Sequence, residues 1–107
     1  MSHRVERFAS TLKHCLAEII LNDIDNPELR LVSISRVDVS PDLKKANVFI
    51  SDSLGMVEDP IGKLNKAKGF IKKRLARKMV LKYMPELIFV EFEYKDSDRS
   101  GSEDDER

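Results

Sequence analysis

The chain has 107 residues with 19 basic and 19 acidic side chains, so its length predicts one domain and its formal net charge is zero. Its only cysteine is Cys15, which excludes an intramolecular disulfide and disfavours a cysteine-ligated zinc site. The sequence shows neither the apolar N-terminal run of a secretory signal nor a segment that could span a membrane, and we therefore expect a cytoplasmic protein without membrane association.

The first predicted element is a helix over residues 2–22. Cys15 lies on its apolar face and is predicted to be a core residue. Arg4 and Arg7 lie off that face, and they are either solvated or additional contacts for an anion. Pro27 predicts the end of this helical region, because proline disfavours helix at the residue before it. The apolar residues recur in steps of three and four, as in a helix with one buried face: Val5, Phe8, Leu12, Leu16, Ile19 and Ile20.

Three strands are predicted, and two of them are adjacent in the sequence. In the first, over residues 31–39, the apolar residues change parity near Ser35 and Arg36, which indicates either a β-bulge or a strand covered differently at its two ends. A turn containing Pro41 leads to the second strand, over residues 45–51, and so short a connection predicts an antiparallel hairpin. The third strand, over residues 87–94, is rich in β-branched and aromatic residues.

The segment over residues 59–82 predicts an amphipathic helix with a cationic outer face. Asp59 and Pro60 are the residue types of a helix cap and a first helical position. The apolar residues again recur in steps of three and four: Ile61, Leu64, Ala67, Ile71, Leu75 and Met79. No acidic residue follows Asp59 in this segment, whereas basic residues are dense: Lys63, Lys66, Lys68, Lys72, Lys73, Arg74, Arg77, Lys78 and Lys82.

Gly69 stands in the middle of this helical pattern, where glycine costs about 1 kcal/mol relative to alanine. In a straight helix Phe70 would project among the lysines and arginines of the outer face. We therefore predict a kink over Ala67, Lys68 and Gly69, with the interruption at Lys68-Gly69 turning Phe70 toward the core. A straight helix that tolerates Gly69 fits the same periodicity.

The composition changes after residue 95, where no apolar residue remains. The segment is predominantly acidic, with Asp96, Asp98, Glu103, Asp104, Asp105 and Glu106 against Arg99 and Arg107. Such a segment cannot bury enough apolar surface to offset the entropy of ordering. We expect a folded domain over residues 1–95 and a disordered acidic tail over residues 96–107.

The order helix, strand, strand, kinked helix pair, strand predicts a single α+β domain whose helices pack on one face of a three-stranded sheet. The sequence offers no catalytic constellation. His14 and Cys15 are neighbours on a helix and point about 100° apart, so they do not form a nucleophile–base pair. No calcium-loop spacing and no phosphate-binding P-loop is present. We therefore expect a binding protein and not an enzyme, with no metal and no cofactor.

The cationic helix face predicts binding to RNA, because neutralisation of phosphates supplies most of the non-specific affinity for nucleic acids. A solvated lysine face and a docking surface for an acidic partner protein are the alternatives. Helices usually interleave charges of both signs, and this segment does not, which favours a polyanionic partner. The candidate RNA-binding residues are Arg4, Arg7, Lys66, Lys68, Gly69, Lys72, Lys73, Arg74 and Arg77.

Five motifs in this order resemble the ribosome-binding factor A family, over residues 4–90. They are Asn-Pro-Glu-Leu at residues 26–29, Val-Asp-Val-Ser-Pro-Asp-Leu at 37–43, Ala-Asn-Val-Phe-Ile-Ser at 46–51, Ala-Lys-Gly-Phe-Ile at 67–71 and Pro-Glu-Leu-Ile-Phe at 85–89. The family usually continues with an aspartate and a short terminal helix, whereas here residues 90–94 extend the strand pattern and an acidic tail follows.

The resemblance implies a KH-like (type II) domain in which an Ala-x-Gly kink replaces the Gly-x-x-Gly loop of other KH domains. It also implies a protein, monomeric when free, that binds the immature small ribosomal subunit and its precursor rRNA. Its expected role is to assist late subunit maturation or processing of the rRNA 5′ end, and to leave once maturation is complete.

Overall fold

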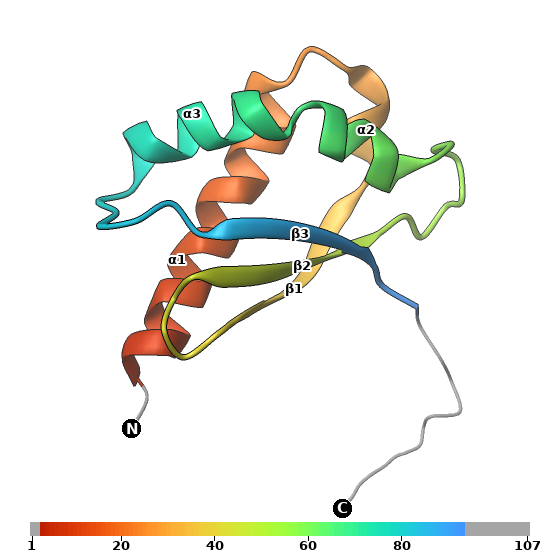
Figure 1. The fold of residues 1–107 in the computed structure, drawn as a ribbon. Helices are drawn as coiled ribbons and strands as arrows, with labels where there is room; N and C mark the ends of the chain where they lie inside the picture. Colours follow the sequence, from red (N-terminus) through yellow and green to blue (C-terminus); the bar gives the residue numbers. More distant parts are fainter. Residues whose placement is uncertain (1–2, 94–107) are drawn as a thin grey trace, which may run out of the picture.

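The computed structural model describes residues 3–93 and confirms the α+β fold with the predicted order of elements (Figure 1). Helix α1 (His3–Glu18) runs into a π-helical turn (Ile19–Asp23) and a 3-10 turn (Pro27–Leu31). The hairpin of β1 (Ser33–Val39) and β2 (Lys45–Ser51), the helix pair α2 (Pro60–Lys66) and α3 (Lys68–Lys78), and β3 (Glu86–Glu91) follow. The predicted acidic tail over residues 96–107, and with it the boundary of the folded domain at residue 95, lies outside the described residues.

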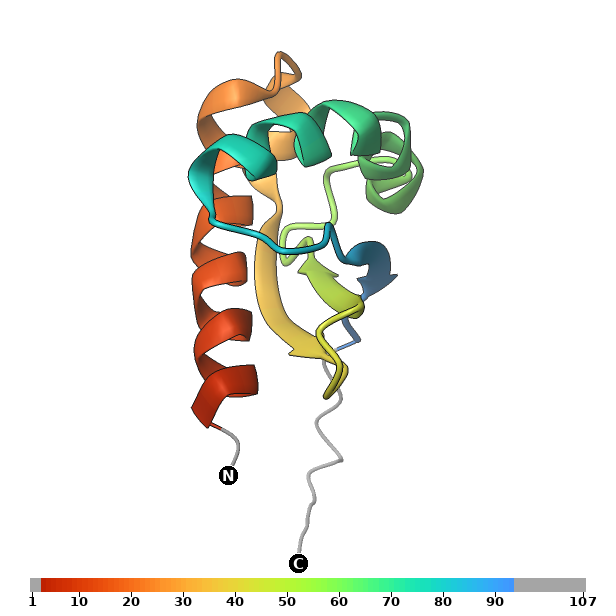
Figure 2. The ribbon, with the colours of Figure 1, turned by 60° about the vertical axis from the view of Figure 1, so that its left-hand side comes forward.

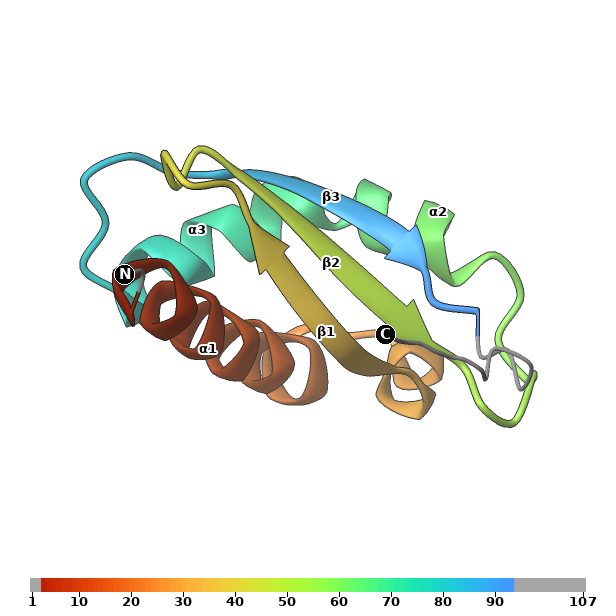
Figure 3. The same cartoon turned by 90° about the horizontal axis from the view of Figure 1, so that it is seen from below.

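The sheet has the strand order β1-β2-β3, with β1 and β2 antiparallel and β2 and β3 parallel. The pairing of β1 with β2 shifts register between Ile34 and Arg36, so the change of parity in the sequence is a β-bulge. The bulge inserts one residue, and as a result Ile34 and Val37 both contact the core despite their odd separation. Figure 3 shows the helices lying on one side of this sheet.

The turn between β1 and β2 is held by hydrogen bonds of the Ser40 and Asp42 side chains. Ser40 accepts a hydrogen bond from the backbone N–H of Lys45 at 3.0 Å, and its hydroxyl donates to the carboxylate of Asp42 at 2.7 Å. This hydroxyl and the N–H of Lys44 lower the pKa of Asp42. These local bonds hold the turn in the conformation from which the hairpin starts to pair.

Two strand boundaries were predicted wrongly. Leu31 belongs to the 3-10 turn and not to β1, because Asn26 caps that turn by accepting a hydrogen bond from the N–H of Glu28 at 3.1 Å. Strand β3 ends at Glu91, so Phe92 and Glu93 are not part of it, and Tyr94 lies outside the described residues. The N–H of Phe92 still donates to the carbonyl of Ile50 at 2.8 Å, but β2 ends at Ser51 and has no residue opposite Glu93.

The core lies between the sheet and the helices, and Cys15 is buried in it as predicted. Burial raises the pKa of the Cys15 thiol, and the nearby Glu18 carboxylate adds to this while Lys78 opposes it. Among residues 3–93 no helix is long and apolar enough to cross a membrane. The fully buried side chains come from every layer and include Leu12, Leu16, Ile19, Leu29, Val48, Ile50, Leu64, Ile71, Leu75 and Leu87.

Helix α2 begins as the sequence predicts. The side chain of Asp59 accepts a hydrogen bond from the N–H of Gly62 at 3.1 Å, and Pro60 occupies the first turn. Asp59 itself has φ +50°, a left-handed conformation that an aspartate tolerates better than most residues. This cap fixes where the helix pair starts and therefore the phase of its buried side chains.

The predicted break between the two helices is present, but it lies at Ala67 and not at Lys68-Gly69. Ala67 has φ −90° and ψ 2°, and its N–H donates to the carbonyls of Lys63 and Leu64 as α2 ends. Gly69 lies inside the first turn of α3 and is not among the residues with positive φ. Its lack of a side chain is therefore not what allows the chain to bend.

The expectation that the kink turns Phe70 toward the core was wrong, because 39% of Phe70 remains exposed. The next residue, Ile71, is fully buried. Consecutive helical side chains point about 100° apart, so a helix that buries Ile71 and Leu75 directs Phe70 to solvent.

Replacement of Gly69 by alanine should stabilise the protein by roughly 0.5–1 kcal/mol, because alanine has the higher helix propensity and the unfolded chain loses freedom. A Cβ atom at Gly69 would meet nothing within 4 Å. Gly62→Ala is the matched control, since its Cβ would collide with the Asp59 carboxylate and disrupt the cap. Urea denaturation measures the free energy of unfolding of both variants. A Gly69→Ala protein less stable than wild type would contradict the helical conformation of Gly69.

Cys15 should react slowly with a thiol reagent in the native protein and rapidly in the denatured protein, because it is buried and its pKa is raised. The raised folded-state pKa also means that burial of the thiol favours folding below its unfolded pKa and that this contribution is lost as the pH rises. The rate of thiol labelling, measured with and without urea, tests whether Cys15 is buried in the native protein. Equal rates in the two states would show that Cys15 is not in the core.

Candidate nucleic-acid interface

The side of α3 opposite the core carries four exposed residues at helical spacing: Phe70, Lys73, Arg74 and Arg77. They follow the pattern i, i+3, i+4 and i+7, so they lie next to one another along one face. We call this set the outer face of α3. Ile71 and Leu75, which are fully buried, anchor the opposite side of the helix and fix its rotation.

Cations also lie on the flanks of the same helix. Lys68 and Lys72 are half-buried, and the ammonium group of Lys68 lies 5.7 Å from the ring centre of Phe89, so this flank faces β3. On the other flank the ammonium group of Lys78 lies 3.5 Å from the Glu18 carboxylate, so that flank faces α1. Positive charge therefore surrounds the part of α3 that the core leaves uncovered.

The inference that the basic segment lacks counter-charges was wrong for two residues. Lys63 and Lys78 pair with Glu28 and Glu18, which lie elsewhere in the chain and approach only in the fold. Such half-exposed pairs contribute about 0–1 kcal/mol each. Among residues 3–93, however, no ion pair involves any of the other candidate cations of this segment: Lys66, Lys68, Lys72, Lys73, Arg74 and Arg77.

The remaining predicted residues lie at opposite ends of α3. Lys66 lines a hollow with Asn26 and Ala67 at the break. Arg4 and Arg7 line another hollow, of about 540 Å³, together with Lys78 and Val80 at the far end of α3. At about 1.5 Å per residue the 11 residues of α3 span roughly 16 Å, so the structure does not bring the two arginines to the break.

Figure 2 shows α3 lying across α1, so that the helix runs from the break at Ala67 to the side of α1. A polyanion that follows the outer face of α3 therefore approaches Lys66 at one end and the arginines of α1 at the other.

The loop after α3 also contributes to this surface, and its position was not predicted. Val80 and Tyr83 are 103% and 64% exposed, and Tyr83 shares a hollow with Arg4 and Lys82. No periodicity marks this loop, so only the fold could place it beside α1. Phe70 was assigned to the core, although its spacing of three and four residues from Lys73 and Arg74 was the signal for an exposed aromatic residue on the outer face.

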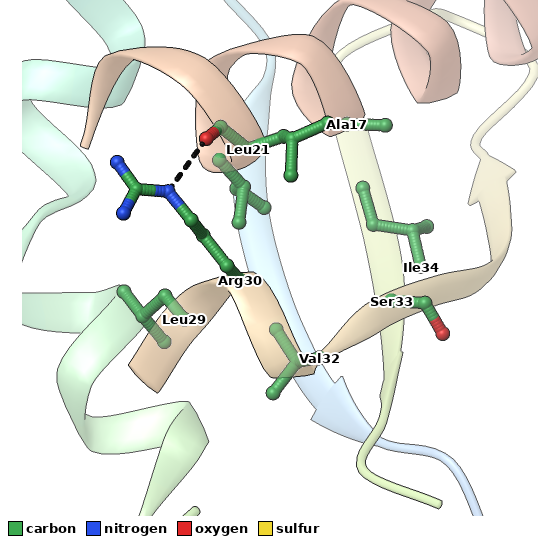
Figure 4. A pocket seen from close by; sticks show the side chains of 8 residues that line it. Ala17, Leu21, Leu29, Arg30, Val32, Ser33 and Ile34 are labelled. Carbon is green, nitrogen blue, oxygen red and sulfur yellow. Dashed lines mark hydrogen bonds between the residues drawn. The ribbon is translucent and has the colours of Figure 1, made fainter. Parts of the chain in front are cut away.

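A separate apolar hollow of about 230 Å³ lies between the end of α1, the 3-10 turn and the start of β1 (Figure 4). Its lining is aliphatic apart from Ser33 and Arg30, and the Nε of Arg30 donates a hydrogen bond to the carbonyl of Leu21 at 3.0 Å. This hydrogen bond holds the Arg30 side chain at one side of the hollow. None of the predicted RNA-binding residues lines it.

No group of three or more histidine, cysteine, aspartate or glutamate side chains within residues 3–93 is arranged to hold a metal ion. His14 lies 3.6 Å from the Glu18 carboxylate at an exposed site, while the neighbouring Cys15 points into the core. The outer face of α3 therefore suits electrostatic contact with a polyanion, and the aromatic ring of Phe70 is part of it.

Comparison with known proteins places the chain in a family. A family described as Ribosome-binding factor A matches residues 4–102. A Ribosome-binding factor A of Carboxydothermus hydrogenoformans is 44% identical over 93 residues, which is 84% of this chain and 74% of that protein. The protein of that name from Desulforamulus reducens is 38% identical, over 83% of this chain and 76% of the relative.

Solved structures agree with these sequence matches. The crystal structure of ribosome-binding factor A from Thermus thermophilus has a TM-score of 0.71 and 25% identity, covering 81% of this chain and 93% of that one. The solution structure of a Thermotoga maritima protein described as a ribosome binding factor A has a TM-score of 0.68 and 30% identity, covering 84% and 88%. A homology model of the Thermus thermophilus factor, fitted into a cryo-EM map of its 30S complex, has a TM-score of 0.68 and 26% identity, covering 79% and 91%. The chain belongs to the ribosome-binding factor A family.

Proposed function

We propose that this protein binds the small ribosomal subunit and its precursor rRNA, and that it assists late subunit maturation, including formation of the rRNA 5′ end. The family assignment and the 30S complex of the Thermus thermophilus relative support binding to the small subunit. The protein acts by binding and not by catalysis in this proposal, as a monomer that leaves when maturation is complete.

The single observation that carries the proposal is the set of unpaired cations around α3. The six predicted RNA-binding cations of the segment form no ion pair with any residue between 3 and 93: Lys66, Lys68, Lys72, Lys73, Arg74 and Arg77. Lys82, at the end of the segment, forms none with those residues either. Cations without an ion-pair partner on one helix repel one another, and a phosphate chain relieves that repulsion while releasing its own counterions. The surface therefore gains more from a polyanion than a surface of mixed charge would.

The break at Ala67 adds a second electrostatic element. Helix α3 starts anew at Lys68, so the positive end of its backbone dipole lies beside Lys66 and Lys68 and next to Gly69. A phosphate at this end would meet side-chain ammonium groups and the helix dipole together. Gly69 has open space at its Cα, which allows a close approach of the RNA backbone.

These contacts position the protein on rRNA more than they read its sequence, because they go to phosphates. If about five of the six cations each neutralise one phosphate, log K should fall with log[salt] at a slope of roughly −3.5 to −4.5. Filter binding or anisotropy with an rRNA fragment over a salt series measures this slope. Replacing one contacting lysine by alanine should make the slope shallower by up to about one unit.

Reversing two charges on α3 should remove binding to small-subunit precursors. The variant is Lys72→Glu with Lys73→Glu, and co-sedimentation with precursor particles is the measurement. Arg36→Glu with Lys45→Glu is a matched control with the same charge change, on the face of the sheet opposite the helices, where the Arg36 guanidinium lies over the Phe49 ring. Circular dichroism should show both variants folded.

Wild-type co-sedimentation of the α3 variant would contradict the proposal. Loss of co-sedimentation together with unchanged affinity for naked rRNA would assign the basic face to an acidic protein partner instead.

A further inference from the structure

Phe70 is anomalous for a residue of a regular element. The exposed large apolar residues within the described part of the chain are Leu21, Leu31, Leu54, Met56, Phe70, Val80 and Tyr83. Of these, Phe70 is the one that lies in the helices α1–α3 or the strands β1–β3. The next residue, Ile71, is fully buried. Phe70 is therefore directed to solvent, on the side of α3 that carries Lys73, Arg74 and Arg77.

The ring is held in place by a cation on one side. The guanidinium carbon of Arg74, one helical turn further along, lies 5.1 Å from the centre of the Phe70 ring. A guanidinium over an aromatic face is attracted by the electron density of the ring, and it restricts the rotation of both side chains. Lys73 and Arg77 complete the outer face on the next turns.

Part of the ring is open to solvent. Although the guanidinium of Arg74 lies over the ring, 39% of Phe70 remains exposed. Gly69, the residue before it, has no side chain that could extend over the ring. A flat group can reach the exposed part of the ring.

We propose that Phe70 is a stacking platform for an unpaired RNA base, and that the RNA segment bound on the outer face of α3 is single-stranded. This inference rests on the proposed function and specifies its ligand. Proteins that hold single strands combine cations along the backbone with aromatic rings on which bases stack. In a duplex each base is already stacked between its neighbours, so it cannot lie on Phe70 without leaving the helix.

In this arrangement Lys73, Arg74 and Arg77 contact phosphates on either side of the stacked base. The side chains are about 5–6 Å apart between neighbouring turns, which keeps base and phosphate contacts within one short stretch of RNA. Arg74 can contact both, because its guanidinium lies over the ring and carries five N–H donors. Stacking is tolerant of base identity, so the platform selects unpaired RNA and not a sequence.

The test compares Phe70→Leu with Phe70→Tyr, since leucine keeps an apolar side chain without an aromatic face and tyrosine keeps that face. The probes are a short unstructured single-stranded RNA and an RNA duplex with the same number of phosphates. Phe70→Leu should weaken binding to the single strand by roughly five- to thirtyfold, while Phe70→Tyr should bind like wild type. Binding of the duplex by either variant should be unchanged.

The salt dependence separates this inference from the proposed function. Phe70→Leu removes no phosphate contact, so its log K–log[salt] slope should equal that of wild type, whereas Lys73→Ala should show a shallower slope. Lys72→Glu with Lys73→Glu should weaken both RNA probes. If that variant fails to weaken either probe, the proposed function is wrong independently of Phe70.

Two results would overturn the stacking platform. One is equal affinity of wild type and Phe70→Leu for the single strand, and the other is an equal loss for single strand and duplex. As a measurement that needs no variant, irradiation of a single strand containing 5-iodouridine should give a covalent adduct at Phe70, because this photoreaction favours stacked aromatic rings. An adduct confined to other residues would count against the inference.

Discussion

The burial of Ile71 and Leu75 against the core is the constraint on which the function of this surface depends. Both side chains are fully enclosed, and together they fix the rotation of α3 about its axis. With the rotation fixed, Lys73 and Arg77 face solvent as a consequence of helical geometry. The hydrophobic core thereby determines the electrostatic surface, and no separate interaction is needed to orient those cations.

The cap at Asp59 and the break at Ala67 adjust this arrangement at its start. Asp59 fixes where α2 begins, and Ala67 ends it, with Leu64 buried on α2 and Ile71 buried on α3. The break also brings a new helix start to the surface beside Lys66. A continuous helix with the same sequence would carry the same side chains, but it would lack this positive dipole end in the middle of the basic segment.

The periodic and local features of the fold could be predicted from the sequence, and the features set by tertiary neighbours could not. The cap at Asp59, the hairpin and the core role of Cys15 follow from residue types and spacing. The ion pairs of Lys63 and Lys78 could not be predicted, because their partners are distant in the sequence. Phe70 was misassigned because an interruption at Lys68-Gly69 was expected to turn it toward the core, although the spacing of Ile71 and Leu75 already fitted a helix that exposes Phe70.

Directed hydroxyl-radical probing tests most directly whether α3 faces rRNA. In a Cys15→Ala background, an iron chelate is tethered through Ala76→Cys, an exposed position on α3, and in a matched protein through Asp38→Cys on β1. Both proteins are bound to small-subunit precursors, and rRNA cleavage is mapped by primer extension. We predict strong local cleavage from position 76 and little from position 38. Cleavage from position 38 with none from position 76 would contradict the account.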